Sequence, residues 1–250
     1  MEAAEYELMD AAEGTMWWYR ALHARLLKSL SPVRGRVLDA GCGTGGFLEI
    51  LRSRRPDLET VGLEWNESAA LHAAEKSGSR VVRGSVNSIP FASGSFDAIV
   101  SADVLCHEAV QPLAALAEFL RLLRSGGLLV INMPAFEWLR SAHDRHVMTA
   151  RRVTARSFAA MLVQTGFGQV RAGYWNTLLF PLMVMRRKLT AHDADAPSDV
   201  APFSPWLNNT LYAVTALEQR LALPIPVGGS VFATAVSPLG AKIEKQSRSE

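Results

Sequence analysis

Residues 37–47 read Val-Leu-Asp-Ala-Gly-Cys-Gly-Thr-Gly-Gly-Phe and form the most informative segment of the chain. The first four residues predict a short buried strand, and the apolar spacing that begins at Phe47 predicts a helix through Arg54. Between the two stands a turn rich in glycine, whose backbone can bend sharply and approach a ligand closely. A strand, a glycine turn and a helix in this order indicate an α/β domain that binds a nucleotide-like cofactor.

The same alternation of strands and helices continues as far as residue 133. Short apolar runs bounded by turn residues predict strands, and apolar residues three or four apart predict helices. The predicted strands are 60–64, 80–83, 96–102 and 128–133, and the predicted helices are 67–76 and one that begins near residue 113 and stops at Gly126-Gly127. Alternation of this kind indicates a parallel sheet with crossover helices.

Beyond residue 134 the pattern predicts one more helix and two more strands. The helix spans 157–165, with Ser157 as its N-cap and Gly166 just after its end. The strands span 170–174 and 230–236, and the long connection between them holds an apolar stretch, a basic triplet and a proline-rich segment.

The composition is that of an ordinary globular protein. The 250 residues are 49% hydrophobic and 20% charged, enough for one well-buried α/β domain with elaborations. A net charge of +2 with a pI near 8.7 falls short of the concentrated basic face that binds nucleic acid, so we expect no nucleic-acid partner. The only two cysteines, Cys42 and Cys106, lack metal-ligand spacing. We expect them to be reduced, in a cytoplasmic protein without a metal.

No signal peptide or transmembrane segment is expected from the sequence. The acidic N-terminal segment lacks the basic and apolar regions of a signal peptide. The apolar stretch Leu178–Met185 is eight residues long and contains Pro181, whereas a spanning helix needs about 20 residues. Peripheral contact with a membrane and the oligomeric state are left open. The polar residues 241–250 are predicted to form a frayed tail.

Of two acidic residues at strand ends, Asp39 helps to distinguish the cofactors that the glycine turn could hold. Gly41, Gly43 and Gly46 also satisfy a dinucleotide fingerprint, so the turn alone is weak evidence. Asp39 favours S-adenosylmethionine, because a carboxylate attracts its ammonium and sulfonium charges but lies badly beside a pyrophosphate. Glu64 closes the second strand, where an acidic side chain binds the ribose hydroxyls of either cofactor. A solvated strand-end charge is the alternative interpretation of Glu64.

Four successive segments resemble the motifs of class I S-adenosylmethionine-dependent methyltransferases. They are VLDAGCGTGGF at 37–47, VGLEWNE at 61–67, IPFASGSFDAIVSADVLCHE at 89–108 and LLRSGGLLVINMP at 122–134. Their order and spacing are more specific than any one segment. The resemblance covers residues 36–134 and implies a Rossmann-like α/β fold, with a seven-stranded, mostly parallel sheet that ends in an antiparallel hairpin.

The resemblance also implies a cofactor, S-adenosyl-L-methionine, and the residues that hold it. The glycine turn lines the methionine part, Glu64 holds the ribose hydroxyls and Trp65 flanks the adenine. Many relatives place an aspartate near the adenine amino group where this chain has Ser85, so adenine recognition is expected to use the backbone of Val86. The two residues after the fourth strand face the transferring methyl group. The implied cofactor-binding residues are Asp39, Gly41, Cys42, Gly43, Gly45, Glu64, Trp65, Ser85, Val86, Ala102 and Asp103.

Two further stretches resemble a bacterial branch of the family that acts on small molecules. MWWYR at 16–20 is similar to an aromatic N-terminal helix of that branch, and PAFEWLRSAHD at 134–144 to its Ser-x-His-Asp segment. The branch often has a histidine and a tyrosine around an Arg-Arg pair, but Thr149 and Val153 flank the pair here. The implied substrate-binding residues are Trp17, Trp18, Tyr19, Arg151 and Arg152. Core packing is the alternative interpretation of the three aromatic residues.

Three residues near the expected acceptor position are candidate catalytic groups. Methyl transfer from a sulfonium is a direct displacement, so the enzyme mainly aligns the reactants and removes a proton if the acceptor carries one. His107 follows the fourth strand and titrates near neutrality. His143 and Asp144 resemble a base and its orienting carboxylate. A role in ordering their loops is the alternative interpretation of all three.

The connection at 175–229 is predicted to form a lid and the acceptor pocket. Its apolar stretch Leu178–Met185 is followed by Arg186-Arg187-Lys188. One interpretation is a core-capping helix with a solvated basic end. The other is an apolar lid over a prenyl or lipid-like acceptor whose phosphate meets the triplet. The expected units are an N-terminal helical cap at 1–35, the cofactor-binding core at 36–174, the lid at 175–229, the last core strand at 230–240 and the tail at 241–250.

The sequence therefore predicts a methyltransferase that acts on a small or lipid-like metabolite. The methylated atom is not readable. Residues 101–104, Ser-Ala-Asp-Val, lack the Asn/Asp-Pro-Pro-Tyr/Phe signature of base-methylating enzymes. Two alternatives are an NAD(P)-dependent oxidoreductase that uses the same glycine turn, and a methyltransferase-like scaffold that binds the cofactor without methyl transfer.

Overall fold

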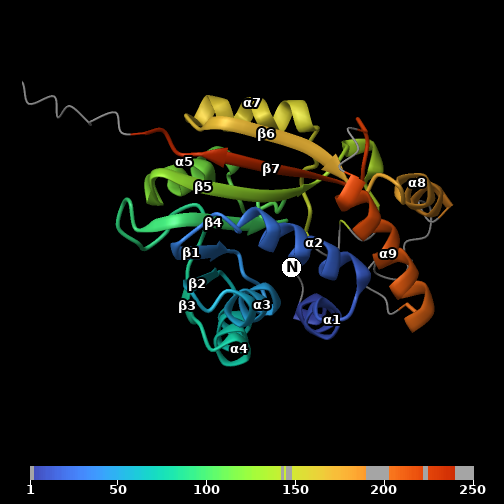
Figure 1. Ribbon diagram of the computed structural model, residues 1–250, viewed down its shortest axis with the longest axis horizontal. Helices are drawn as coiled ribbons and strands as arrows, with labels where there is room; N and C mark the ends of the chain where they lie inside the picture. The colour runs from blue at the N-terminus through green and yellow to red at the C-terminus, as the bar shows by residue number, and fades with distance from the viewer. Residues whose placement is uncertain (1–2, 142–143, 145–147, 190–202, 222–224, 240–250) are drawn as a thin grey trace, which may run out of the picture.

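Seven strands form one sheet in the computed structural model, which describes residues 3–141, 144, 148–189, 203–221 and 225–239. The order across the sheet is β3-β2-β1-β4-β5-β7-β6 (Figure 1). The first five strands are parallel, and β7 is antiparallel to both of its neighbours, as predicted. The strands are β1 (Gly35–Ala40), β2 (Leu58–Glu64), β3 (Arg80–Arg83), β4 (Phe96–Ala102), β5 (Leu123–Pro134), β6 (Gly168–Trp175) and β7 (Ser230–Val236).

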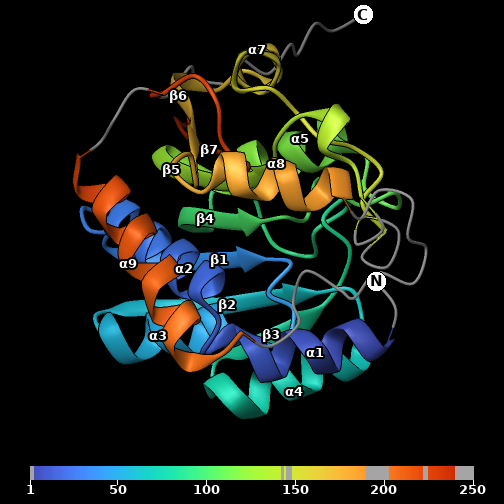
Figure 2. The same cartoon turned by 90° about the vertical axis from the view of Figure 1, so that its right-hand side faces the viewer.

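Helices cover both faces of the sheet, and three of them stand at the edge where the parallel strands end (Figures 1 and 2). Those three are α1, α8 and α9. Among the described residues no helix has both the length and the apolar character needed to cross a membrane. The helices are α1 (Ala3–Glu13), α2 (Trp17–Ser29), α3 (Gly46–Arg54), α4 (Glu67–Ser77), α5 (Pro112–Leu122), the 3-10 turn η1 (Glu137–Leu139), α7 (Ala155–Thr165), α8 (Phe180–Leu189) and α9 (Pro205–Leu221).

The alternation of side chains along each strand divides the core into two clusters. In β1, Val37 packs with α2 and α3, whereas Leu38 packs with α5 and α7 on the other face. In β5, Val130 belongs to the first cluster, and Leu129 and Ile131 belong to the second. These strands are apolar on both sides because helices cover both faces, as is typical of a parallel sheet.

The strand order reverses between β1 and β4. From β1 the chain builds outward through β2 to β3, and it then returns to the centre to build β4 and β5 on the other side. The loops that follow β1 and β4 therefore diverge and leave a crevice at the carboxyl ends of the strands. In open α/β sheets this is where ligands bind.

Two predicted boundaries differ from the structure. The helix expected to stop at Gly126-Gly127 ends at Leu122, because Leu123 already pairs with Phe96 as the first residue of β5. The glycine pair therefore lies inside β5, where Gly126 adopts a φ of 76° and the ladder shifts register. The N-cap of α7 is Thr154 instead of Ser157, which occupies the third helical position.

Thr154 and Ser157 cap α7 reciprocally. The Thr154 hydroxyl oxygen accepts the Ser157 backbone N–H at 3.1 Å, and the Ser157 hydroxyl oxygen accepts the Thr154 backbone N–H at 3.0 Å. Both N–H groups would otherwise lack partners at the start of the helix. The helix ends at Gly166, which has a φ of 106°, as the sequence predicted for a glycine there.

We expect the Thr154→Ala variant to unfold with a free energy about 1 kcal/mol lower than the parent, because alanine removes one half of the capping box. Urea denaturation followed by circular dichroism measures this change. Thr165→Ala is the matched control in the same helix, since within the described part of the chain its hydroxyl donates only to the Met161 carbonyl, at 2.9 Å. Equal losses in the two variants would contradict the capping role.

Candidate active site

A cavity of about 860 Å³ opens at the carboxyl ends of the central strands. Its walls include the glycine turn, the ends of β2 and β4 and the loops after β3 and β4. They also include the N-terminal helices α1 and α2, residues between β5 and α7, the start of β7 and the segments around α8 and α9. Every cofactor-binding residue expected from the sequence lines this cavity except Gly45. Trp65 does so from an exposed position, with 70% of its surface accessible.

The glycines of the turn have separate structural tasks. A side chain at Gly43 would meet the Met9 Cε atom at 2.6 Å, so this position brings the turn against α1. A side chain at Gly45 would meet the Ala73 Cα atom at 2.8 Å, so Gly45 permits close packing of α3 on α4. Gly45 has a φ of 92°, which a residue with a side chain rarely adopts. Gly45 therefore lies against α4, outside the cavity lining. Its predicted contact with the cofactor stays a prediction.

The glycine-turn end of the cavity is acidic. Asp39, Glu64 and Glu13 are all buried there, and no described group donates a hydrogen bond to the Asp39 carboxylate. Burial, reinforced by the charges of Glu64 and Glu13, raises the pKa of Asp39 to about 7. A cationic ligand at this end would favour the ionised carboxylate, so the residues present suit a positively charged group.

Glu64 is held in place from three directions. Its Oε2 atom accepts the Gly43 backbone N–H at 3.0 Å, and its Oε1 atom accepts the Asn66 backbone N–H and the Tyr6 hydroxyl, each at 3.0 Å. Two of these donors come from the polypeptide near the turn, but Tyr6 comes from α1. A carboxylate can accept further hydrogen bonds beyond these, so Glu64 can also bind hydroxyl groups of a ligand.

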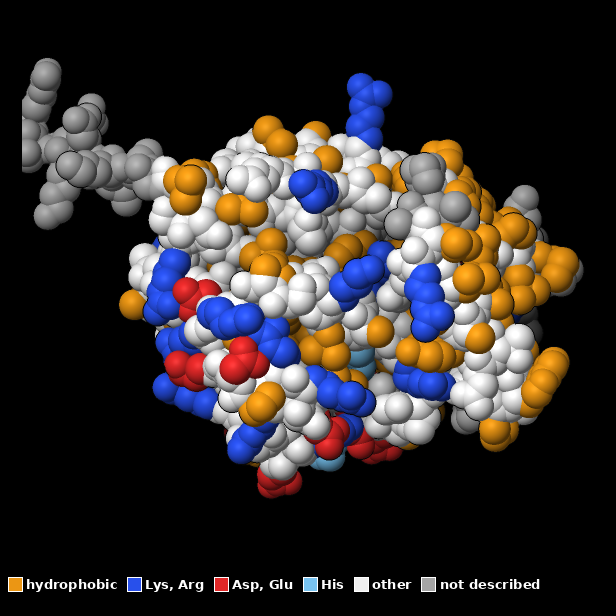
Figure 3. Space-filling view, in the orientation of Figure 1, with side chains coloured by type: hydrophobic (Ala, Val, Ile, Leu, Met, Phe, Trp, Pro, Cys, Tyr) orange, Lys and Arg blue, Asp and Glu red, His pale blue; other side chains and the backbone are white. Residues whose placement is uncertain are grey.

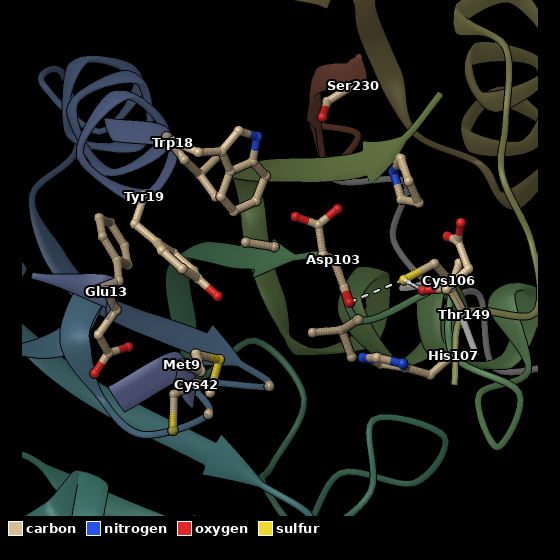
Figure 4. Close-up of a pocket in the computed structure, with 18 of the residues that line it drawn as sticks. Met9, Glu13, Trp18, Tyr19, Cys42, Asp103, Cys106, His107, Thr149 and Ser230 are labelled. Atoms are coloured by element: carbon tan, nitrogen blue, oxygen red, sulfur yellow. Dashed lines mark hydrogen bonds between the residues drawn. The ribbon is translucent and has the colours of Figure 1, made fainter. Parts of the chain in front are cut away.

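Asp103 occupies the wall after β4, on a backbone with a φ of 54°. Figure 4 shows its side chain in the cavity, between Trp18 and His107. The Asp103 Oδ2 atom accepts the Asn132 Nδ2–H at 2.8 Å, and the Asn132 Oδ1 atom accepts the Trp175 Nε1–H at 2.7 Å. An indole nitrogen only donates. Trp175 therefore fixes which end of the Asn132 amide faces Asp103.

Burial raises the pKa of Asp103 to about 6, against the lowering effects of Asn132 and Arg152. The carboxyl group therefore changes charge close to neutral pH, where a general base must operate. Asn132 and Trp175 were not among the residues singled out from the sequence. Asn132 had a readable signal, because it is the one polar side chain in the apolar run 128–133.

Most of the predicted catalytic and substrate-binding residues line the cavity. His107 lines the cavity beside Cys106 and Thr149 (Figure 4). Trp17, Trp18 and Tyr19 also line it, and Trp18 additionally stacks on Trp175, with ring centroids 5.9 Å apart. His143 lies outside the described residues.

Asp144 and the Arg-Arg pair are engaged within the protein. The Asp144 Oδ1 atom accepts both the Nε–H and an Nη2–H of Arg152, at 3.0 and 2.6 Å. Both of these residues line the cavity. Arg151 does not, because its Nη1 atom donates to the carbonyls of Leu105, His107 and Val110. The structure thus gives Arg151 a position that orders the loop after β4.

Comparison with known proteins gives one family match and several partial relatives. Residues 38–131 match the model of a methyltransferase domain. The chain is 34% identical over 108 residues to tRNA (carboxymethyluridine(34)-5-O)-methyltransferase alkbh8 of Xenopus tropicalis, covering 42% of this chain and 16% of the relative. It is 31% identical over 163 residues to malonyl-[acyl-carrier protein] O-methyltransferase of Erwinia pyrifoliae, covering 63% of this chain and 61% of the relative. The chain thus spans less than two thirds of either relative.

Solved structures share the fold at low sequence identity. Phosphoethanolamine N-methyltransferase 2 of Haemonchus contortus, in complex with S-adenosyl-L-methionine, aligns with a TM-score of 0.60 and 18% identity. The alignment covers 87% of this chain and 52% of that protein. At this level of identity the likeness concerns the fold.

We expect Asp39→Asn to stabilise the ligand-free protein at pH 8 by roughly 2–4 kcal/mol. The folded-state pKa of about 7 lies above the usual 3.8, so the folded state retains a proton that the unfolded chain has released. The Asp39 contribution to the free energy of unfolding therefore falls as pH rises from about 4 to about 7, and asparagine abolishes that fall.

Urea denaturation at pH 4.5 and pH 8 tests this expectation. Glu49→Gln is the control, because it removes an exposed carboxylate from α3. If the free energy of unfolding of Asp39→Asn changes with pH as it does in the parent, the pKa of Asp39 in the folded protein is not raised.

The indole N–H resonance of Trp175 should shift with pH, with a midpoint near pH 6. When Asp103 ionises, the hydrogen bond that it accepts from Asn132 becomes stronger. This bond polarises the Asn132 amide, whose oxygen accepts the indole N–H of Trp175. Nitrogen-15 NMR of the ligand-free protein measures this shift, and Trp175→Phe assigns the signal. The exposed indole of Trp65 is an internal control. A titration that persists in Asp103→Asn would rule out Asp103 as its source.

Proposed function

We propose that this chain is a class I S-adenosylmethionine-dependent methyltransferase that methylates a small or lipid-like metabolite, and the methyltransferase domain matched at residues 38–131 supports the proposal. One observation carries the proposal: a single cavity joins an acidic end at the glycine turn to an apolar region under α2, α8 and α9. The acidic end suits the cofactor, and the apolar region suits the acceptor.

The residues at the glycine turn suit S-adenosyl-L-methionine. Asp39 offers a buried carboxylate without a protein cation among the described residues, and Glu64 offers oxygens to ribose hydroxyls. Ser85 and Val86 line the same cavity beyond β3, where the adenine is expected. When bound, the cofactor supplies a methyl group on a positively charged sulfur. A pyrophosphate beside Asp39 and Glu64 would be repelled, which disfavours the dinucleotide alternative.

Helix α1 is the part of the N-terminal cap that covers the cofactor end. Tyr6 binds Glu64, and Met9 and Glu13 line the cavity beside the turn. Lys76 of α4 forms ion pairs with both Asp10 and Glu13, which fasten α1 to the core. We infer that α1 shields this end of the cavity from water.

The segments around α8 and α9 support the proposed lid at 175–229. Leu179, Leu182 and Met183 line the cavity from α8 and its approach, and Leu207 and Leu211 line it from α9. Helix α9 is joined to α2 by the Gln219 side chain, whose Nε2 atom donates to the Ala21 carbonyl at 2.9 Å. Flexible apolar side chains adapt to irregular ligands, so a prenyl or other lipid-like chain, with or without a phosphate, is the acceptor class that we propose.

The outer surface of the lid is also apolar. Figure 3 shows hydrophobic side chains gathered over α8 and α9. Leu182, Met185 and Trp206 are more than half exposed there, at 51%, 55% and 76%. We propose that this surface allows peripheral contact with a membrane that holds a lipid-like acceptor. Cytoplasmic location and the absence of a nucleic-acid partner remain part of the proposal, although one relative carries a tRNA methyltransferase name.

Within the site we assign proton removal to Asp103 ahead of the histidines. Asn132 holds the Asp103 Oδ2 atom, and no described group donates a hydrogen bond to its Oδ1 atom in the cavity. The Oδ1 atom can therefore accept a proton from the acceptor. His107 lines the same wall and stays a second candidate. The proposed acid–base role of Asp144 is weakened by its ion pair with Arg152.

Calorimetric titration with S-adenosylhomocysteine tests the cofactor assignment. We expect one site per chain, no binding of a nicotinamide dinucleotide, and a loss of about 1–3 kcal/mol in binding free energy for Glu64→Ala, the usual cost of removing a charged hydrogen-bond partner. Glu49→Gln should bind as the parent does. Unchanged affinity in Glu64→Ala, or preference for the dinucleotide, would overturn the assignment.

A further inference from the structure

Two uncharged polar side chains line the cavity at the base of the terminal hairpin, apart from the acidic glycine turn. Asn176 directly follows β6, and Ser230 is the first residue of β7. Trp175 pairs with Ser230, so the long connection between the two strands leaves and re-enters the sheet at the same place. We call Asn176 and Ser230 the polar pair. One residue precedes the connection and the other follows it, so no local motif predicts the pair.

The backbone brings the two members of the polar pair together. The Gly229 backbone N–H donates to the Asn176 carbonyl at 3.4 Å. The Asn176 Nδ2 atom lies 3.2 Å from the position that a Cβ atom on Gly229 would take, so the amide packs against the residue next to Ser230. Asn176 adopts a φ of 58°, which asparagine tolerates better than most residues with a side chain. This conformation favours asparagine or glycine, but it does not explain how the amide is hydrogen-bonded.

Both side chains are buried, yet neither makes a hydrogen bond within the described part of the chain. Asn176 is 4% accessible and Ser230 is 5% accessible. The Asn176 Oδ1 atom is buried without a hydrogen-bond partner. No described group hydrogen-bonds to the Asn176 Nδ2 atom or to the Ser230 hydroxyl. Buried polar side chains normally have hydrogen-bond partners, because an unsatisfied group loses its contacts with water without replacement. A ligand in the cavity would supply the missing partners.

The polar pair lies on the side of the cavity where we expect the acceptor. Ser230 pairs with Pro134 of β5, two residues after Asn132, which holds Asp103. Figure 4 shows the Ser230 hydroxyl directed toward the part of the cavity that holds the Asp103 carboxylate. A group bound to the polar pair would therefore belong to the molecule whose proton we assign to Asp103.

We propose that Asn176 and Ser230 bind an uncharged oxygen substituent of the acceptor, a hydroxyl or a carbonyl, apart from the atom that receives the methyl group. The inference rests on the proposed function and makes the acceptor an oxygenated molecule. The Ser230 hydroxyl both donates and accepts. Rotation about the last side-chain bond of Asn176 exchanges its amide donor and acceptor, so the pair can bind either kind of oxygen. We assign an uncharged substituent because ionised Asp103 would repel an anionic one.

Matched phenols test the proposal on the full chain. Each dihydroxybenzene is compared with the cresol in which a methyl group replaces one hydroxyl, and with the hydroxybenzaldehyde of the same substitution. All are titrated in the presence of S-adenosylhomocysteine and followed by nitrogen-15 NMR. An apolar cavity alone would favour the cresols.

We expect at least one dihydroxybenzene or hydroxybenzaldehyde to bind about fivefold more tightly than its cresol, because its second oxygen gains hydrogen bonds. The tighter of the two identifies the substituent as a hydroxyl or a carbonyl. Cresols that bind as tightly as their oxygenated counterparts at every ring position, or no binding of any probe, would overturn the proposal.

Three variants connect the preference to the polar pair. Asn176→Gly keeps the positive φ without strain and removes the amide, so the preference should fall below about twofold while stability to urea stays close to the parent. Ser230→Ala should lower the preference in the same way. Thr177→Val is the matched control, because the Thr177 hydroxyl is also buried without a partner but Thr177 does not line the cavity. Full preference in Asn176→Gly, or equal loss in Thr177→Val, would refute the subsite.

S-Adenosylhomocysteine binding separates this inference from the proposed function and checks the fold of each variant. If S-adenosylhomocysteine binds the parent but no oxygenated probe is preferred, the subsite is wrong and the proposed function stands. If S-adenosylhomocysteine does not bind the parent, the proposed function fails, and the same titrations in the ligand-free protein decide whether the polar pair binds oxygen.

Discussion

Burial of Asp39 at the end of β1 is the constraint on which the rest of the site depends. Its carboxylate lies close enough to Glu64 and Glu13 to feel both charges, with its pKa raised to about 7. Such an arrangement opposes stability, and it persists because the apolar strands around it fix the backbone. A cation that entered the cavity would remove the repulsion. The site is therefore built to bind positive charge before any particular ligand is considered.

A second constraint comes from one polar residue inside an apolar strand. Asn132 is fully buried in β5, and its amide is satisfied by Trp175 on one side and Asp103 on the other. Trp175 also stacks on Trp18 of α2. The chain of contacts links β6, β5, the loop after β4 and the N-terminal cap. These contacts connect the cap to the carboxyl group that we propose removes the proton.

The cavity has both charged and apolar walls, and the charges of opposite sign lie in different parts of it. Carboxylates gather at the glycine turn, and guanidinium groups gather between η1, α7 and α8. Opposite charges separated by apolar walls can orient a pair of ligands, because each charged group has one favourable end of the cavity. The acidic end suits the cationic methyl donor that we propose.

The sequence by itself determined the sheet, and it predicted most of the residues that line the glycine-turn end of the cavity. Both depend on short-range signals: apolar runs that match β1 to β5, and a glycine turn flanked by Asp39 that the strand order brings beside Glu64. Even there, the boundary between α5 and β5 was misplaced, because Leu123 suits either a helix or a strand and only its pairing with Phe96 decides. The tertiary structure decided the partners of Arg151, Arg152 and Asp144. Side chains separated by many residues meet only after the sheet has formed, and no local pattern records which of them will share a buried charge.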